Sequence, residues 1–477
     1  MQIQDQTITT ILEGYKSKKF SVSDVVLAYL DRIEKIDPDL NSFITVTKAE
    51  ALRKAKEMDS KTSEISTMPL FGIPIALKDM YITKGIRTTA ASNVLKDYIP
   101  QYDASVVKKY KDAGAIILGK LNHDAWAHGS SGENSDFGAT KNPWNKDFVP
   151  GGSSSGSGVS VAAGLAPVAS GTDTGGSIRQ PASFTNTVGL KPTYGRVSRN
   201  GIIAMASSLD SIGHFTKTVS DSAQVLQVTA GQDLLDATLT PKDVPNYLEN
   251  LRQGIKGMKL GIPKEFVEKG LQPEVKQVFE KSVKEFEKLG AEIIEVSLPH
   301  TEYGIAIYYI IQTAEVSSNL ARYDGVRYGN DRTAFGEEAK RRIMLGTYVL
   351  SAGYYDAYYK KAMQVRTLVK KDFEKVFGQV DALIAPVAPS LPWKLGEKVS
   401  DPLSMYLEDA LTVTINMAGV PAISVPAGFS HSTSSGEAGK LPVGLQIIGP
   451  HFSEDKLFQI GYAFEQETNY WKEAPKL

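Results

Sequence analysis

Apolar and polar positions along the chain form a pattern that predicts strands alternating with helices. Short, nearly continuous apolar runs are typical of buried strands, and they occur at 71–77, 115–118, 167–170, 381–387, 421–428 and 441–449. Between such runs apolar residues recur at helical spacing, as in 273–290, which has proline at its start and glycine at its end. This alternation, with no clear linker, predicts one α/β domain over residues 1–477 with a parallel or mixed sheet.

Parts of this predicted domain differ in character. Residues 1–65 are expected to form an N-terminal layer of amphipathic helices, the second starting near Ser21. Residues 188–213 are expected to be mostly loop, and a helix is expected to open at Asp221. Residues 302–377 are mostly helical and rich in tyrosine, so we expect some of the tyrosine pairs to line a cavity on the substrate side.

Residues 149–181 are rich in serine and glycine and almost free of charge. A flexible linker has a similar composition, but this stretch also contains a small, apolar helix candidate followed by a buried-strand candidate. The pattern therefore predicts two serine–glycine turns that flank a buried helix and strand. Glycine tolerates positive φ, so such turns can aim several backbone N–H groups at one point. Serines beside such groups indicate nucleophilic catalysis with an oxyanion hole.

Other motifs fit this chain less well. In the serine–glycine stretch, Ser157 replaces the lysine of a phosphate loop, and Val161 replaces the last glycine of the dinucleotide fingerprint. Residues 152–156 match GxSxG, but they follow a loop, whereas a nucleophile elbow follows a strand. His123 and His128 lack a third ligand in view, so we interpret them as polar loop residues and expect no metal site.

Lys78 follows the apolar run at 71–77. Two interpretations are open from the residues alone. In the first, the lysine lies at a strand end and extends its ammonium group to water. In the second, an apolar pocket lowers its pKa so that it can act as a base.

Composition excludes several classes of function. The 477 residues carry a net charge of −1, so this chain is not expected to bind nucleic acid tightly by itself. The chain has no cysteine, which excludes disulfides, thiolate catalysis and cysteine-based metal sites. No signal peptide and no run of 18 apolar residues is evident, so we expect a cytoplasmic protein with no membrane contact.

The motifs GGSSSGS and DTGGSIRQPA, placed after Lys78, resemble those of the amidase signature family. That resemblance implies a central mixed β-sheet covered on both faces by helices, and a Ser–cis-Ser–Lys catalytic set. Ser177 matches the nucleophile, Ser153 the bridging serine with its cis peptide, and Lys78 the base. The backbone of Thr174, Gly175 and Gly176, with Ser177, matches the oxyanion hole.

Segments further along resemble one branch of this family, the glutaminase A subunits of glutamyl-tRNA(Gln)/aspartyl-tRNA(Asn) amidotransferases. The resemblance implies that Tyr308, Arg342 and Asp409 hold the charged end of glutamine. It also implies B and C subunits as partners, no cofactor in this chain, ATP and Mg used by a partner subunit, and misacylated tRNA bound through the B subunit. The forked guanidinium group of an arginine suits the α-carboxylate of glutamine, and the carboxylate of an aspartate suits its α-ammonium group.

Three departures from the family pattern bear on these expectations. Ser155 replaces a usual glycine, NHDAWAHG differs from the usual NLDEFAMG near His128, and the link at 330–334 is short. Two alternatives remain open. A stand-alone amidase acting on small amides would share Lys78, Ser153 and Ser177, whereas a catalytically silent scaffold would require the loss of one of them.

Overall fold

The computed structural model describes residues 6–268, 270–327, 329–430 and 439–477. Its central element is an eleven-stranded sheet in the order β1-β3-β2-β4-β6-β5-β10-β11-β9-β7-β8. The strands are β1 Phe43–Val46, β2 Pro74–Lys78, β3 Ile116–Leu121, β4 Val168–Asp173, β5 Val188–Lys191, β6 Ser211–Thr216, β7 Lys259–Pro263, β8 Glu292–Val296, β9 Ala382–Pro386, β10 Ala422–Phe429 and β11 Pro442–Ile448.

Parallel pairs join β2 to β3 and β4, and β7 to β8 and β9, while the other neighbours are antiparallel. The predicted mixed sheet is therefore confirmed. Every residue of β2, β4, β6, β9 and β11 is buried, so both faces of the sheet's middle are covered. The helices that pack around it are α1 Ile8–Lys16, α2 Val22–Leu40, α3 Lys48–Asp59, α4 Ser105–Asp112, α5 Ser155–Ala162, α6 Arg179–Thr185, α7 Val219–Thr229, α8 Pro273–Lys288, α9 Gly304–Leu320, α10 Glu337–Val349, α11 Lys361–Phe377, α12 Pro402–Leu407, α13 Val413–Ala418 and α14 Glu454–Thr468.

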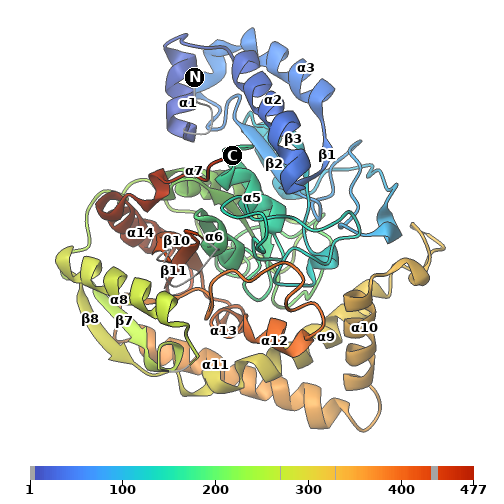
Figure 1. Cartoon of the computed structure of the whole chain (residues 1–477), viewed down its shortest axis with the longest axis vertical. Helices are drawn as coiled ribbons and strands as arrows, with labels where there is room; N and C mark the ends of the chain where they lie inside the picture. The colour runs from blue at the N-terminus through green and yellow to red at the C-terminus, as the bar shows by residue number, and fades with distance from the viewer. Residues whose placement is uncertain (1–5, 269, 328, 431–438) are drawn as a thin grey trace.

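The N-terminal helices α1 to α3 lie together at the top of Figure 1. Helix α2 starts where the sequence predicts, because the Ser21 side chain and Asp24 form a capping box there. This part of the chain also supplies β1, an edge strand that pairs with β3. It is therefore joined to the sheet by backbone hydrogen bonds as well as by helix packing.

The serine–glycine stretch forms the predicted buried helix and strand, α5 and β4. The residues that follow depart from the sequence-based expectation. Residues 188–213 contain β5 and the first half of β6, and α6 precedes them. These elements are short and interrupted by glycine and polar residues, so no periodic pattern marks them. Helix α7 begins at Val219 rather than Asp221, because Thr218 is its N-cap and accepts from the Asp221 N–H.

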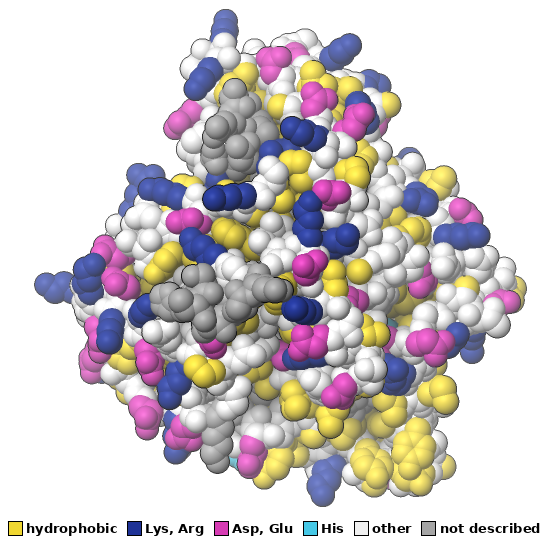
Figure 2. Space-filling model, viewed as in Figure 1, with side chains coloured by type: hydrophobic (Ala, Val, Ile, Leu, Met, Phe, Trp, Pro, Cys, Tyr) yellow, Lys and Arg dark blue, Asp and Glu magenta, His cyan; other side chains and the backbone are white. Residues whose placement is uncertain are grey.

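Helices α9 to α11 form the lower edge of the molecule in Figure 1. Hydrophobic side chains gather at the lower right of Figure 2, over α10 and the start of α11. Three tyrosines of this region, Tyr354, Tyr355 and Tyr358, are exposed; Tyr354 stacks on Tyr358, and Tyr355 is tilted against Tyr359. They belong to a surface, whereas Tyr308 is buried and Tyr309 is partly buried.

Most of the serine-rich loop at 430–440, for which the sequence predicts flexibility, lies outside the described residues. Among the described helices, none is long and apolar enough to cross a membrane.

Candidate active site

Lys78 is the last residue of β2 and its side chain has no exposed surface. Its Nζ atom lies 2.9 Å from Ser153 Oγ, 2.9 Å from Ser154 Oγ and 2.8 Å from Thr172 Oγ1. Burial lowers the pKa of Lys78 to about 7, against the opposing charges of Asp124, Asp173 and Asp210. The interpretation of Lys78 as a lysine reaching water is therefore wrong, and the second interpretation, a buried lysine with a lowered pKa, remains.

The sheet explains how these hydroxyl groups reach one amine. Strand β2 lies between β3 and β4, and the Lys78 N–H donates to Ser170 Oγ on β4 at 2.9 Å. Thr172 lies two residues further along β4, so its side chain points to the same face as that of Ser170. Ser153 and Ser154 immediately precede α5, at the carboxyl end of β2.

The peptide bond between Gly152 and Ser153 is cis, as the family resemblance implies. The turn leaves no room for larger residues: a Cβ atom on Gly152 would lie 2.1 Å from Asp124 Oδ2. Asp124 also stabilises this turn through its backbone, because its N–H donates to the Ser153 carbonyl at 3.1 Å. Its carboxylate accepts from the N–H groups of Gly132 and Asn134, each at 3.0 Å.

Ser177 lies in the turn after β4 and is 9 % exposed. Its carbonyl accepts from the Ser154 N–H at 3.1 Å, so the two serine–glycine turns are in direct contact. Lys78 and Ser153 thus share a direct hydrogen bond, and Ser177 is joined to them through the backbone of Ser154.

The Asp173 carboxylate shapes the DTGGS turn. It accepts from the Gly176 N–H at 2.9 Å and forms a buried ion pair with Arg179 at 3.0 Å. In this conformation the Gly176 N–H is therefore engaged within the turn. The N–H groups of Thr174, Gly175 and Ser177 donate to no protein atom within the described ranges. Three of the four expected oxyanion-hole donors are thus available to a ligand.

The second group of predicted residues surrounds the tyrosine pair of α9. A Cβ atom on Gly175 would lie 2.5 Å from Tyr308 Oη, so Tyr308 borders the DTGGS turn. The Asp409 carboxylate accepts from Tyr309 Oη at 2.9 Å and from Ser130 Oγ at 2.8 Å. The Arg342 guanidinium lies 5.4 Å from the centre of the Tyr309 ring.

Arg342 and Asp409 are 3 % and 8 % exposed, so neither is a charge on the solvent-exposed face of a helix. Arg342 Nε donates to Glu338 Oε1 at 2.8 Å. Burial raises the pKa of Asp409 to about 7, although the hydrogen bonds from Ser130 and Tyr309 and the charge of Arg342 oppose this. A cation and an acid therefore both contact Tyr309, the cation over its ring and the acid at its hydroxyl group.

Sequence patterns assign no role to several residues of this arrangement. Tyr309 contacts both Arg342 and Asp409 and is adjacent to the predicted Tyr308. The two consecutive tyrosines were the sequence feature that could have identified Tyr309. Ser130 and Asp124 belong to a loop distant in sequence from Asp409 and Ser153. Thr412 donates to the carbonyl oxygens of Gly175 and Asp409 and so connects the two groups of residues.

The departures from the family pattern have structural consequences. Ser155 is the first residue of α5, does not have positive φ, and donates to Thr140 Oγ1 at 3.1 Å. His123 and His128 are fully buried instead of lying on a polar loop surface. The described residues contain no group of three or more His, Cys, Asp or Glu side chains that could hold a metal ion. In the short link, the Asn330 N–H donates to Val94 O at 2.7 Å.

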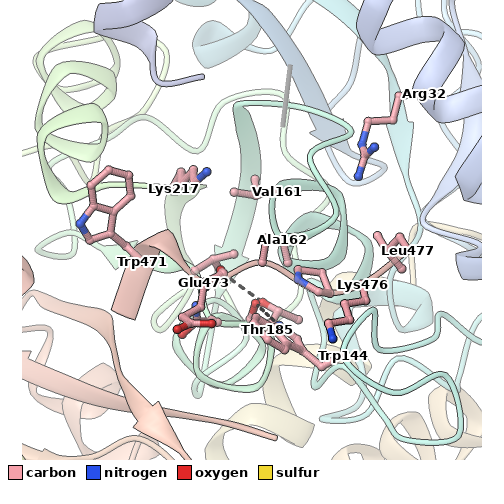
Figure 3. A pocket seen from close by; sticks show the side chains of 14 residues that line it. Arg32, Trp144, Val161, Ala162, Thr185, Lys217, Trp471, Glu473, Lys476 and Leu477 are labelled. Atoms are coloured by element: carbon pink, nitrogen blue, oxygen red, sulfur yellow. Dashed lines mark hydrogen bonds between the residues drawn. The ribbon is translucent and has the colours of Figure 1, made fainter. Parts of the chain in front are cut away.

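A separate cavity of about 660 Å³ lies between the ends of α5 and α6 and the C-terminal residues 471–477 (Figure 3). Arg32, Trp144, Lys217 and Trp471 are among its lining residues. None of the predicted site residues lines it. The candidate site is therefore the region around Lys78, Ser177 and Tyr309.

Comparisons with known proteins identify the family of the chain. The family model described as Amidase matches residues 24–458. The chain is 53 % identical to the A subunit of a glutamyl-tRNA(Gln) amidotransferase from Alkaliphilus metalliredigens, over 100 % of this chain and 99 % of that protein. The crystal structure of the corresponding Thermotoga maritima protein is similar with a TM-score of 0.83 and 41 % identity, covering 100 % of this chain and 98 % of that one. A peptide amidase in complex with the inhibitor chymostatin is similar with a TM-score of 0.84 and 30 % identity, over 99 % of both chains.

Proposed function

Because the chain belongs to the amidase signature family, and within it to the A subunits of glutamyl-tRNA(Gln) amidotransferases, we propose that it is a glutaminase subunit. It hydrolyses the side-chain amide of glutamine and releases ammonia. The ammonia serves the ATP-dependent conversion of Glu-tRNA(Gln) to Gln-tRNA(Gln) on a partner subunit, and of Asp-tRNA(Asn) to Asn-tRNA(Asn) where that substrate is also used. The single observation that carries the proposal is the buried hydrogen bond between Lys78 and Ser153, beside Ser177.

The proposed reaction starts with neutral Lys78. Lys78 takes a proton from Ser153, which takes one from Ser177, and Ser177 Oγ attacks the amide carbon. The negative oxygen is held by the N–H groups of the DTGGS turn, among them those of Thr174, Gly175 and Ser177, with Gly176 shaping the turn. The C–N bond then breaks, and the relay returns a proton to the leaving nitrogen. Water attacks the resulting glutamyl ester and frees Ser177, with glutamate as the second product.

The proposed substrate contacts follow from charge. Arg342 binds the α-carboxylate of glutamine, and Asp409 accepts from its α-ammonium group. Tyr308 borders both this end and the DTGGS turn, so it positions the amide over Ser177. Fixing the charged end of the amino acid at both of its groups holds the amide at the nucleophile, and such positioning is a general source of rate enhancement.

The proposed partners are the B and C subunits of a three-subunit amidotransferase. Misacylated tRNA, ATP and Mg belong to the partner subunit in this proposal, and no cofactor is assigned to this chain. The same role in tRNA-dependent synthesis suggests the cytoplasm as its location. We also propose that the chain is one domain, because a single sheet connects its N-terminal and C-terminal parts.

A second candidate is a stand-alone amidase, and the similarity to a peptide amidase favours it. That enzyme class would need Lys78, Ser153 and Ser177, but it has no need of a paired cation and acid for a free amino acid. The discriminating residues are therefore Arg342 and Asp409, which are buried and both contact Tyr309.

The test measures ammonia and glutamate released from glutamine by the purified full chain, alone and co-purified with B and C subunits. Propionamide serves as the uncharged substrate, and Ser177→Ala as the inactive control. A kcat/KM that is much higher for glutamine supports the proposal. Equal use of both amides would favour the stand-alone amidase, and release from neither would favour a silent scaffold.

A further inference from the structure

His128 is a fully buried side chain near Arg342 to which the proposed reaction gives no role. Both of its ring nitrogens lack a hydrogen-bond partner within the described residues. A buried polar atom without a partner is costly, and native structures usually provide one from protein, water or a ligand. The position is also unusual, since His128 stands where the similar motif NLDEFAMG has methionine.

The backbone around His128 is firmly held. The Asn134 side chain donates to the His128 carbonyl at 3.0 Å, and the His128 N–H donates to Ala125 O at 3.0 Å. Trp126 packs against Phe335, just before α10, with 5.2 Å between ring centres. The backbone of this loop is therefore fixed, and the loop packs beside the segment that leads into α10.

The same loop faces the helix that carries Arg342. A cavity of about 210 Å³ lies between residues 133–136 of this loop and residues 336–339 at the start of α10. Arg342 lies one turn further along that helix. Burial, together with the charge of Arg342, lowers the pKa of His128 well below its usual value. The imidazole is therefore neutral, with one N–H to donate and one nitrogen to accept.

Ser130, two residues after His128, donates to Asp409 at 2.8 Å. His128 and Ser130 belong to the same short loop segment. This loop thus contacts the acid of the proposed glutamine site through Ser130, and it brings His128 within reach of the charge of Arg342.

We propose that His128 is a specificity-determining residue of the glutamine site, whose imidazole N–H donates a hydrogen bond to the α-carboxylate that Arg342 binds. The inference rests on the proposed function, because it assigns a further contact in that site. A substrate without a carboxylate leaves the buried imidazole unpartnered and is rejected for that reason. Arg342, a charged donor, and His128, a neutral donor, then both contribute to selectivity for a free amino acid.

The test compares glutamine with 4-aminobutanamide, which is glutamine without its carboxylate. His128→Met removes the donor while restoring the residue of the similar motif, and the flexible methionine fits irregular space. His128→Gln keeps an N–H donor. His214→Gln is the matched control, because His214 is also buried but bonds to Ser222 away from the site.

For His128→Met we expect kcat/KM for glutamine to fall about 10- to 100-fold, mainly through KM, as for a hydrogen bond to a charged group. Turnover of 4-aminobutanamide should change less than about twofold, and His128→Gln should recover part of the loss. His214→Gln should leave the ratio of the two substrates unchanged. Glutamine binding to Ser177→Ala with and without His128→Met, measured by calorimetry, should show the same loss of affinity.

An unchanged KM for glutamine in His128→Met, or equal losses on the two substrates, would overturn the proposal. If His128→Met loses activity equally on the two substrates, circular dichroism and thermal melting show whether that variant has lost its fold. Where it has, the kinetics of His128→Gln, which keeps an N–H donor, decide the outcome. Failure of the wild-type chain to hydrolyse glutamine would instead reject the proposed function, so the two failures are distinguishable.

Discussion

Lys78 Nζ lies 2.9 Å from Ser153 Oγ, in an interior where neither residue has exposed surface. A lysine in water is protonated until about pH 10.4, whereas burial lowers the pKa of Lys78 to about 7. A substantial share of Lys78 is therefore neutral at physiological pH, and a neutral amine can accept a proton from a serine. This relationship is the physical basis of the predictions that follow.

Activity should rise with pH through about 7, because only deprotonated Lys78 serves as the proposed base. Lys78→Arg should lose roughly 10²- to 10⁴-fold in kcat, since an arginine side chain stays protonated in proteins. The measurement is glutamine hydrolysis between pH 5.5 and 9. A Lys78→Arg protein with the wild-type rate would exclude Lys78 as the base.

Asp124→Asn should shift the acid limb of that profile to lower pH. Among the carboxylates that raise the pKa of Lys78 against burial, Asp124 has the largest effect, so its removal lowers the pKa of Lys78 further. Burial also raises the pKa of Asp124 to about 7, so Asp124 carries its full charge only above that pH and the shift should be small. Asparagine keeps an oxygen that can accept from Gly132 and Asn134, whereas Asp124→Ala loses those bonds and serves as the structural comparison. A limb displaced to higher pH would refute this electrostatic assignment.

Lys78→Met should be more stable than the wild type near pH 7 and below. The unfolded chain keeps the Lys78 proton up to about pH 10.5, while the folded chain holds it only below about 7. The unfolded state therefore binds more protons between these values, and wild-type stability gains up to about 5 kcal/mol from Lys78 as pH rises through them.

The variant lacks this gain, so the difference in Tm between Lys78→Met and wild type should shrink as pH rises from 7 to 10. The hydroxyl groups of Ser153, Ser154 and Thr172 lose a partner in the variant, which offsets part of the difference at every pH. Calorimetric melting at several pH values provides the measurement. A difference independent of pH would mean that Lys78 is charged in the fold.

Arg342→Ala and Asp409→Ala should lower kcat/KM for glutamine by about 30-fold to several thousand-fold, as expected for losing a buried charge contact. Propionamide turnover should barely change, because that substrate has no charged end. Arg341→Ala is the matched control, since Arg341 is the neighbouring residue on α10, pairs with the same Glu338 and is 41 % exposed. Equal losses on both substrates would assign Arg342 and Asp409 to the fold.

The sequence correctly predicted the helices and strands whose apolar pattern and end residues are visible within the segment itself. The buried helix and strand of residues 149–181, the capped helix after Ser21 and the helix predicted at 273–290 all have apolar patterns with turn or capping residues at their ends. Strands β5 and β6 were missed because pairing with β4 and β10 stabilises them, and that pairing is not visible in four to six residues.

The candidate site likewise contains residues that local motifs identify and contacts that local motifs do not identify. Ser153 and Ser177 stand within recognisable motifs, so their neighbourhood follows from the sequence. The contacts of Asp124 with the Ser153 carbonyl and of Ser130 with Asp409 join parts of the chain far apart in sequence. Nothing in either local pattern indicates such partners, and the burial of His128 likewise follows only from the packing of its loop against α10.

The most direct test of the proposed mechanism locates the acyl group. The full chain is mixed with glutamine, quenched with acid within the first turnover, digested and analysed by mass spectrometry. We predict a γ-glutamyl group on Ser177, located by fragmentation because Ser153, Ser154 and Ser177 share one stretch without Lys or Arg, with both the adduct and glutamine hydrolysis absent in Ser177→Ala. A γ-glutamyl group on Ser153 or Ser154, or full glutamine hydrolysis by Ser177→Ala, would contradict the mechanism.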